Sequence, residues 1–550
     1  MIISNKNGNT IYKSWRVNGV KQSEEVEYRP YFYVLSDTKE RPTYTISKYT
    51  NGKFEYVEGD WQDLEGNSLK RVYVEKSWDM VKARQCFDKT YEADVAYTFR
   101  YAVDEVNEMP EYNMRKWYWD MEWQQGGEHH DEITTIVMYD NYDKEYFQWV
   151  WFPNQEPYDG FKMSTDKVQH VSVFNTEKEM IEHFMGTMIA KDPDMLIAWF
   201  GLKFDLPKLL DRACALGLNP LVMSPYHKID GVKQLKNGCS FKRQDGYSPI
   251  EQPIGGRLTL NLDLAFERQW NDSQRGTLPS LSLDYVSKLL FDEGKVMDTK
   301  FEDPNEFYRR AWLEDTKAYL QYAVVDVELL VKIDEKNYCS EAILSLQRLL
   351  KAPFKACFYA SHMGSIYFMR NAWWKAPTGI KSADRKEYEG AMIYDPLSES
   401  TNGLHLNVAA FDFAGLYPSM MVARNISWET KSETPTEFGV NILTPRDFSE
   451  PEGDRMYYYK TDELGLLPKA VLELKELRND YKKRMKNSEG DEYVKWYNNQ
   501  MAVKRLMASF YGVLAYQGFG WADVDLAASI TASAREAIRL AAFKAKELEV

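Results

Sequence analysis

The hydrophobic pattern of this chain changes its period from one region to the next, and this change most constrains the fold. Over roughly the first 100 residues polar and apolar positions alternate, as in the stretch YRPYFYVLSD that begins at Tyr28, and such alternation is typical of β-strands. Later segments mix both periods, and we expect strands at 116–123 and 132–139 and helices at 177–190, 313–334, 468–486 and 492–515. The pattern predicts an α/β protein with a β-rich amino-terminal region.

Length and composition set the scale of this fold. The chain has 550 residues, of which 44% are hydrophobic and 28% charged, and no uninterrupted run of about 18 apolar residues could span a bilayer. These values predict a globular protein of roughly three or four domains without a membrane partner. The first residues, MIISNKNGNT, lack the basic and apolar regions of a secretory signal, so we expect a cytoplasmic protein.

Charge is distributed unevenly along the chain. The net charge of −14, from 69 Lys and Arg against 83 Asp and Glu, argues against a protein that coats nucleic acid with a whole basic face. A local excess occurs at 469–488, where seven basic residues stand against three acidic ones, and it predicts a site for phosphate groups. The alternative is a solvated helix laced with ion pairs, because Glu473, Glu476 and Asp480 lie among the cations.

The five cysteines are odd in number, lie far apart and form no C-x-x-C pair; they are Cys86, Cys214, Cys239, Cys339 and Cys357. This spacing argues against a disulfide framework or a zinc cluster. We therefore expect buried thiols.

Acidic residues stand at three places that could serve one site. Asp120 and Glu122 lie two apart in an expected strand, so both carboxylates share one face. Asp205 closes an apolar strand-like run, and Tyr322 and Asp326 lie four apart on one helical face. Carboxylates are the ligands that Mg²⁺ and Mn²⁺ prefer. Each pattern alone is equally typical of a solvated strand or helix face, since the chain has 83 acidic residues.

Taken in this order, Asp120, Glu122, Asp205, Tyr322 and Asp326 resemble the exonuclease motifs of family B DNA polymerases, and the stretch LPSLSLDYVSKLLFDEGK at 278–295 is similar to the family's segment between the second and third motifs. The resemblance implies a 3′–5′ exonuclease in which the four acids hold two Mg²⁺ or Mn²⁺ ions and the Tyr322 hydroxyl orients the attacking water. Nucleoside monophosphates would be its products. One departure is Phe200, where the family usually has Asn.

A second group of motifs follows in the other half of the chain. The run AAFDFAGLYPSM at 409–420 resembles the family's first polymerase motif, KRLMASFYG at 504–512 resembles its K-x-x-x-N-S-x-Y-G motif, and YEGAMIYDP at 388–396 resembles its Y-x-G-G/A element. Gly415 and Ala508 depart from the usual Ser and Asn. By itself, the first run is equally typical of a strand end with a proline turn.

The resemblance implies a second site with two Mg²⁺ or Mn²⁺ ions. Asp412 would be its catalytic acid, and Asp412 and Phe413 its metal-binding positions. Positions that would bind the deoxynucleoside triphosphate are Leu416, Tyr417, Arg478, Lys482, Lys504, Tyr511 and Gly512. The ring of Tyr417 would exclude a 2′-hydroxyl.

The family's second metal-binding carboxylate, in a D-T-D-S turn, has no counterpart in this sequence. Asp523 and Asp525 form the D-x-D that follows Lys504, and we expect Asp525 to open a helix and cap its free N–H groups. The interpretation is an N-terminal part of the enzyme, either one chain of a split polymerase or a truncated one, without a thumb. A second polypeptide would complete it, and a viral source acting in the host cytoplasm fits so compact an enzyme.

The resemblance also implies domain boundaries and partners. The expected domains are a β-rich N-terminal domain at 1–105, an RNase H-like exonuclease domain at 106–340, a helical connector at 341–385, the first part of the palm at 386–468, two-helix fingers at 469–524, and an incomplete palm helix at 525–550. Expected partners are primer-template DNA, the 3′ end of single-stranded DNA, dNTPs and a sliding clamp.

Three other hypotheses compete with this one. The first is a nuclease whose polymerase half only binds DNA. In this hypothesis the acidic residues form the nuclease site, but Arg478 binds no nucleotide. A carbohydrate enzyme suits paired carboxylates and the 14% aromatic content, but it leaves the helices of Arg478 and Lys504 unexplained. A non-catalytic scaffold requires that no metal binds at Asp120.

Overall fold

The computed structural model describes residues 1–40, 54–153, 169–272, 276–294, 299–301, 303–379, 388–390, 406, 412–435, 440–444, 455–460, 462–516 and 518–547. The chain divides into two units. Unit 1 comprises residues 1–28, 107–348 and 353–358, and unit 2 comprises residues 29–106, 349–352 and 359–550. Each contains strands and helices, which confirms the expected α/β class.

A mixed six-stranded sheet forms the centre of unit 1. Its strands, in spatial order, are β10 (Gln169–Phe174), β9 (Glu145–Trp151), β8 (Ile133–Asp140), β7 (Lys116–Trp123), β11 (Met195–Ala198) and β14 (Leu258–Asn261). The pairs β7–β8 and β8–β9 are antiparallel, whereas β9–β10, β7–β11 and β11–β14 are parallel. All residues of β11 and β14 are buried, as strands covered on both faces must be.

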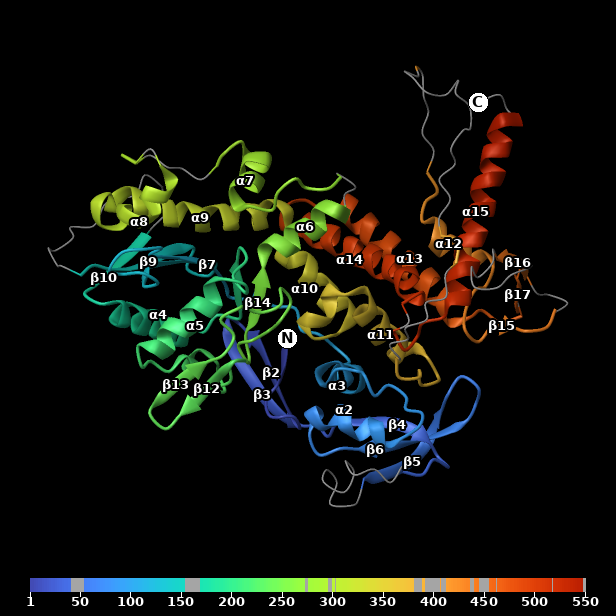
Figure 1. Cartoon of the computed structure of the whole chain (residues 1–550). Coiled ribbons are helices and arrows are strands. Elements are labelled where there is room, and N and C mark those ends of the chain that lie inside the picture. The colour runs from blue at the N-terminus through green and yellow to red at the C-terminus, as the bar shows by residue number, and fades with distance from the viewer. Residues whose placement is uncertain are drawn as a thin grey trace. The chain divides into compact units, whose positions relative to one another are not determined.

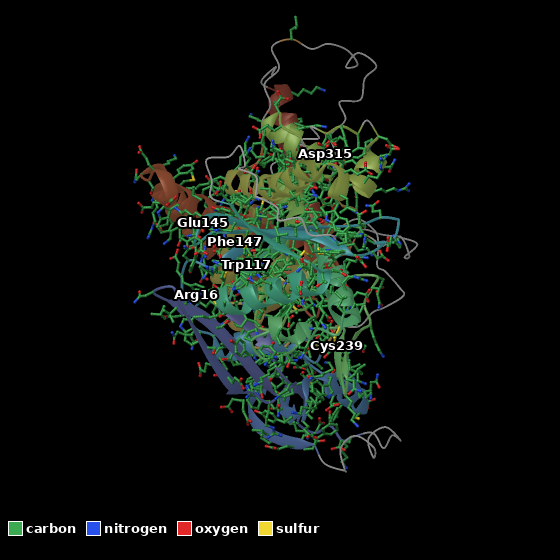
Figure 2. The ribbon with its side chains drawn as sticks, turned by 90° about the vertical axis from the view of Figure 1, so that its left-hand side faces the viewer. Arg16, Trp117, Glu145, Phe147, Cys239 and Asp315 are labelled. Atoms are coloured by element: carbon green, nitrogen blue, oxygen red, sulfur yellow. A yellow bond between two sulfur atoms is a disulfide. The ribbon has the colours of Figure 1, made fainter. Side chains whose placement is uncertain are left out.

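Helices cover both faces of this sheet (Figure 1). On one face lie α4 (Glu177–Lys191) and α5 (Asp205–Ala215), and on the other lies α9 (Thr316–Asn337). The core between sheet and α4 is aromatic: Phe184 packs against Trp117 and Trp149, with ring centroids 6.2 and 5.2 Å away. Trp117, labelled in Figure 2, is fully buried. The sheet is therefore a rigid base for the residues at its edge.

An antiparallel sheet at the start of the chain belongs to unit 1. It consists of β1 (Ile2–Asn5), β2 (Thr10–Val17) and β3 (Val20–Glu27). Arg16 on β2, labelled in Figure 2, forms a buried ion pair with Asp194, just before β11. Because this pair and the bond from Lys228 Nζ to the Asn5 carbonyl at 2.7 Å tie the sheet to the later residues, the units do not follow the expected boundary at residue 105.

The remaining elements belong to unit 1, except that the last two residues of α10 belong to unit 2. They are the 3₁₀ turn η3 (Pro220–Met223), the hairpin β12 (Val232–Leu235) and β13 (Gly238–Phe241), and α6 (Leu262–Asp272), α7 (Leu283–Phe291), α8 (Pro304–Glu314), α10 (Cys339–Leu350) and η4 (Phe354–Phe358). The hairpin packs against α5. Among the described helices, none combines the length and apolarity that crossing a bilayer requires.

Unit 2 combines two small sheets with long helices. The first sheet is β4 (Tyr31–Leu35), β6 (Ser68–Tyr73) and β5 (Glu55–Gln62), followed by η1 (Ser77–Asp79), α2 (Met80–Ala83), η2 (Arg84–Cys86) and α3 (Tyr97–Glu105). The later elements are α11 (Ala360–Asn371), α12 (Leu416–Ala423), β15 (Lys431–Ser432), β16 (Val440–Thr444), β17 (Arg455–Tyr459), α13 (Leu466–Lys486), α14 (Gly490–Leu514) and α15 (Val524–Glu547). Phe368 on α11 packs against Phe510 on α14 at 4.9 Å between ring centroids.

The expected strands and helices are confirmed, with ends that differ by a few residues. Only the helix at 313–334 changes appreciably, because α8 ends at Glu314 and α9 begins at Thr316. The single residue between these helices is Asp315, labelled in Figure 2. Its carboxylate accepts hydrogen bonds from Thr299 Oγ1 at 2.8 Å and from the Lys300 N–H at 3.1 Å.

The expectation that all cysteines are free thiols was wrong. Cys214 on α5 and Cys239 on β13 form a disulfide, with Cα atoms 5.3 Å apart, whereas Cys86, Cys339 and Cys357 are free and buried. The pair is separated by 25 residues, and spacing could not reveal it because the hairpin must first fold back onto α5.

Thiol titration tests this disulfide. Denatured without reductant, the protein should expose the three free cysteines, and all five after reduction. In the native state these thiols should react slowly, because burial raises the pKa of Cys357 to about 12 and the thiolate is the reactive form. Cys214→Ser should lower the free energy of unfolding by about 2–4 kcal/mol, to the value of the reduced wild type. Five reactive thiols before reduction would contradict the assignment.

Candidate functional site

Three of the predicted acids meet between β7 and α9. Along β7, Trp117, Trp119 and Met121 enter the core, so the alternation places Asp120 and Glu122 on the opposite face, toward α9. Asp326 lies on α9 and is buried. One carboxylate oxygen from each of Asp120, Glu122 and Asp326 lies within 4.8 Å of the other two. We call these three residues the acidic cluster.

Hydrogen bonds at two places along α9 hold the helix against the sheet. The Tyr118 hydroxyl donates to Asp334 at 2.6 Å, and both side chains are buried. Toward the start of α9 the hydroxyls of Tyr319 and Thr134 lie 2.7 Å apart, and Thr134 donates to the Glu122 carbonyl at 3.1 Å. These bonds bracket the acidic cluster and fix the register of α9 on β7.

Tyr322 lies beside the acidic cluster, as the four-residue spacing to Asp326 predicts. Burial, followed by the charges of Glu122 and Asp326, raises the pKa of Tyr322 well above its usual value. The phenol therefore keeps its proton. Its hydroxyl oxygen lies 3.3 Å from that of Tyr308 on α8. No sequence motif pointed to Tyr308, because its contact with Tyr322 exists only once α8 packs on α9.

Asp205 lies outside the acidic cluster. The expectation that it closes a strand was wrong, because β11 ends at Ala198 and Asp205 is the first residue of α5, where it is buried. The loop before it leaves β11 at Ala198, and β11 runs parallel to β7, so the loop lies at the sheet edge where β7 also ends. Gly201 in this loop is required, because a Cβ atom there would lie 2.4 Å from that of Ala198. Phe204 precedes Asp205 and is 52% exposed.

The predicted cations of unit 2 gather on the antiparallel pair of α13 and α14. Arg478 and Lys482 lie on α13, and Lys504 lies on α14. The charge of Arg478 first, then burial and the charges of Lys486 and Lys504, lower the pKa of Lys482. Burial lowers the pKa of Arg478 as well. Such mutual effects require that the cations lie close together, as one anion site needs.

Tyrosine rings adjoin the exposed face of α14. Lys504, Ala508 and Gly512 are exposed on α14, and Tyr511 is half-buried. The ring of Tyr511 lies 4.4 Å from that of Tyr417, which follows Leu416 at the start of α12.

A third tyrosine and an unpredicted arginine complete this group. The Tyr511 hydroxyl oxygen lies 3.2 Å from that of Tyr388. Arg535 on α15 donates to the carbonyl of Gly390 at 2.7 Å and to that of Glu389. Arg535 thereby holds the short segment that carries Tyr388. Residues 391–396 of the element that starts at Tyr388 lie outside the described residues.

Asp412 and Phe413 precede α12 and are exposed. Residues 407–411, immediately before them, lie outside the described residues. Gly415 has φ of +72°, in the left-handed region that favours glycine, which explains its departure from the usual Ser. In the parts of the chain that the structure describes, Asp412 joins no group of three metal-ligating side chains.

The expectation that Asp525 caps the last helix was wrong. The carboxylate of Asp523 accepts the N–H bonds of Asp525 and Leu526 at 3.0 and 3.2 Å, because a cap must precede the first turn and α15 begins at Val524. Asp525 instead pairs with Lys431 and accepts a bond from the Tyr457 hydroxyl at 2.6 Å.

Comparisons with known proteins match both regions. The family model for the exonuclease domain of DNA polymerase family B matches residues 88–262, and the model for DNA polymerase family B matches residues 359–546. The first range includes Asp120, Glu122 and Asp205, and the second includes Asp412 and every predicted nucleotide-binding residue. Tyr322 and Asp326 lie outside both ranges, and the structure places Asp326 in the acidic cluster and Tyr322 beside it.

Individual relatives are DNA polymerases. That of Pyrococcus glycovorans is 27% identical over 407 residues, which are 71% of this chain and 47% of the relative. That of Thermococcus gorgonarius is 24% identical over 477 residues, 84% of this chain and 55% of the relative. The DNA polymerase delta catalytic subunit of Plasmodium falciparum is 27% identical over 380 residues, 66% of this chain and 33% of the relative. The chain thus spans about half the length of its curated relatives or less.

The two family models match separate regions of the chain, and the relatives extend across 66–84% of it. Together they show that this chain belongs to the family B DNA polymerases and carries the exonuclease domain of that family.

Proposed function

We propose that this chain is the part of a DNA-directed DNA polymerase that contains the 3′–5′ proofreading exonuclease and the nucleotide-binding helices of the polymerase. The observation that carries the proposal is the acidic cluster beside Tyr322, because three carboxylates within 4.8 Å of one another are suited to cations. The substrates are the 3′ end of single-stranded DNA for the exonuclease, and primer-template DNA with dNTPs for the polymerase.

The donor set of the acidic cluster fits a hard divalent cation. Asp120, Glu122 and Asp326 offer carboxylate oxygens only, which suit Mg²⁺ or Mn²⁺ better than a thiophilic metal. These residues would hold the ions, with Asp205 as a fourth ligand. When bound, two such ions activate water and stabilise the departing oxygen of a phosphodiester.

The protein's own groups orient the reactants. Tyr322 keeps its proton because its pKa is raised, so its hydroxyl can donate to or position a water molecule. The exposed ring of Phe204 next to Asp205 offers a stacking surface for a terminal base. Because the hydrogen bonds along α9 hold Asp326 on β7, the carboxylates need no rearrangement before the reaction.

For the polymerase, we infer that residues 469–524 form the fingers and that 386–468 and 525–550 contribute to the palm. Arg478, Lys482 and Lys504 bind the triphosphate, since guanidinium and ammonium groups complement phosphate oxygens. Tyr417 lies beside Tyr511 and selects a deoxyribose, and Asp412 and Phe413 contribute metal ligands. A further segment or a second polypeptide supplies the D-T-D-S turn and the thumb, and a sliding clamp is a further partner.

A second candidate function is a 3′–5′ exonuclease whose unit 2 only binds DNA. One observation favours it. Within the described residues, the group of three carboxylates lies in unit 1, and no such group of carboxylates surrounds Asp412. The two candidates differ in whether the cations of α13 and α14 bind a nucleotide.

Asp120→Ala tests the exonuclease. With Mn²⁺ present, the variant should degrade 5′-labelled single-stranded DNA from its 3′ end more than about 100-fold more slowly than the wild type, since it loses a metal ligand. Glu145→Ala is the control, because Glu145 is a carboxylate on β9 of the same sheet that pairs with His170 (Figure 2). Equal rates for Asp120→Ala and the control would exclude the proposed ligands.

Tyr322→Phe tests the role of the phenol. The turnover number of the exonuclease should fall roughly 100-fold, while the KM for DNA changes little. Because the pKa of Tyr322 is raised, the hydroxyl stays neutral at every ordinary assay pH, so the wild-type rate should show no decline from Tyr322 between pH 7 and about 10. An alkaline decline that Tyr322→Phe removes would refute this assignment.

Arg478→Ala separates the two candidate functions. Loss of a charged hydrogen bond to phosphate should weaken dNTP binding by about 10- to 100-fold, as measured by calorimetry or fluorescence titration. Arg484→Ala is the matched control on the same helix, because Arg484 is exposed and pairs with Asp480 at 2.8 Å. If both variants bind dNTPs like the wild type, the DNA-binding platform is favoured.

A further inference from the structure

The loop between β11 and α5 carries backbone strain next to a candidate metal ligand. This loop, residues 199–204, leads from Ala198 to Asp205. Phe200 within it has φ of +55°, a conformation that costs a bulky residue roughly 1–3 kcal/mol and persists only where its surroundings enforce it. Phe200 thus marks a place where the protein maintains a particular backbone path.

Two side chains enforce that path, one at the end of the neighbouring strand β14 and one in the helix that follows it. The carboxylate of Asp263 accepts the Phe200 N–H at 3.0 Å, and the amide oxygen of Asn261 accepts the Leu202 N–H at 3.0 Å. Asn261 ends β14 and Asp263 is in the first turn of α6. Both are buried, 2% and 5% exposed, so each bond forms away from water.

Strand pairing explains why these two residues reach the loop. β11 and β14 are parallel, and Ala198 pairs with Asn261 in their register. The residues that follow both strands therefore emerge at one edge of the sheet, where Asn261 and Asp263 reach the N–H groups of Leu202 and Phe200. The same edge is where β7 places the acidic cluster.

Phe200 is the pivot of the loop. Its N–H is held by Asp263, and its carbonyl accepts the N–H groups of Lys203 and Phe204 at 2.8 and 3.1 Å. The rotation of this one residue therefore sets the direction in which Phe204 and Asp205 leave the loop. Without the bond to Asp263, the strained φ would relax and carry Asp205 with it.

Burial of the Asp263 carboxylate is electrostatically unfavourable for its charged form. Burial raises the pKa of Asp263 to about 6, against the hydrogen bonds from the backbone N–H groups of Phe200, Asp263 and Leu264. A buried acid that binds only backbone N–H groups indicates a role in shaping the backbone.

We propose that Asp263 and Asn261 are positioning residues of the exonuclease site, which hold the strained loop so that Asp205 and Phe204 face the acidic cluster. They act through the backbone and touch neither substrate nor cation. The inference rests on the proposed exonuclease function. It adds two residues that the motifs did not identify. Asp263 lies between the two regions that the family models match, residues 88–262 and 359–546.

The experiment is a double-mutant cycle between Asp263→Ala and Phe200→Gly in the full chain. Asp263→Ala should lower the exonuclease turnover number about 10- to 100-fold and weaken Mn²⁺ binding by a similar factor, measured by electron paramagnetic resonance. Adding Phe200→Gly should recover at least about tenfold of each loss, because glycine adopts a positive φ without strain. Asp263→Asn should stay within about threefold of the wild type, since its amide oxygen can accept the same bond.

Asp140→Ala is the matched control. Asp140 is fully buried and accepts the backbone N–H of Tyr142 at 2.9 Å, and its carboxylate also pairs with Arg115 and accepts the Trp117 indole N–H, each at 2.8 Å. It lies opposite Trp117 at the start of β7, away from the end that carries the acidic cluster. This variant should lower the melting temperature while leaving turnover and Mn²⁺ affinity within about threefold of the wild type. If Asp263→Ala does not fold, Asn261→Ala takes its place, with the same expected losses.

The outcomes separate the two proposals. If the wild type degrades no DNA, the proposed exonuclease fails, and the Mn²⁺ affinities alone decide whether Asp263 positions Asp205. If Asp263→Ala lowers only the melting temperature, as Asp140→Ala does, or if Phe200→Gly recovers nothing, the positioning role is overturned.

Discussion

Repulsion among carboxylates is the constraint on which unit 1 depends. Three acids whose oxygens lie within 4.8 Å of one another disfavour their shared charged state, so packing elsewhere must hold them together. The hydrogen bonds along α9 provide that force, from Tyr118 and Asp334 at one place and from Thr134 and Tyr319 at another. The aromatic core on the far face of the sheet keeps β7 itself from moving. The fold thus holds these like charges together against their repulsion.

Much of this site could be predicted from the sequence because its spacing is local. A period of two placed Asp120 and Glu122 on one face, and a spacing of four placed Tyr322 with Asp326. The two pairs come together through the contact between α9 and β7, which are nearly 200 residues apart in the chain. Only the family resemblance predicted that they belong to one site. Tyr308, Asn261 and Asp263 gave no signal, because each acts through a contact that no local period encodes.

The errors have related physical causes. The disulfide between Cys214 and Cys239 depends on a hairpin that returns to α5, which cysteine spacing does not reveal. The capping role passed from Asp525 to Asp523 because a shift of two residues decides which carboxylate meets the free N–H groups. In unit 2, the hydrophobic pattern predicted the two helices that carry Arg478, Lys482 and Lys504, yet it could not show that Arg535 would hold Glu389 and Gly390.

Gly415 shows how a departure from a family pattern can be an adaptation of the individual chain. Its φ of +72° lies where any other residue would be strained, although a Cβ there would meet no neighbouring atom within 4 Å. Restoring the serine that relatives usually carry would therefore cost roughly 1–2 kcal/mol from the backbone alone. A consensus-based stabilisation of this enzyme would do better to leave that glycine untouched, because the average of a family does not describe the backbone of each member.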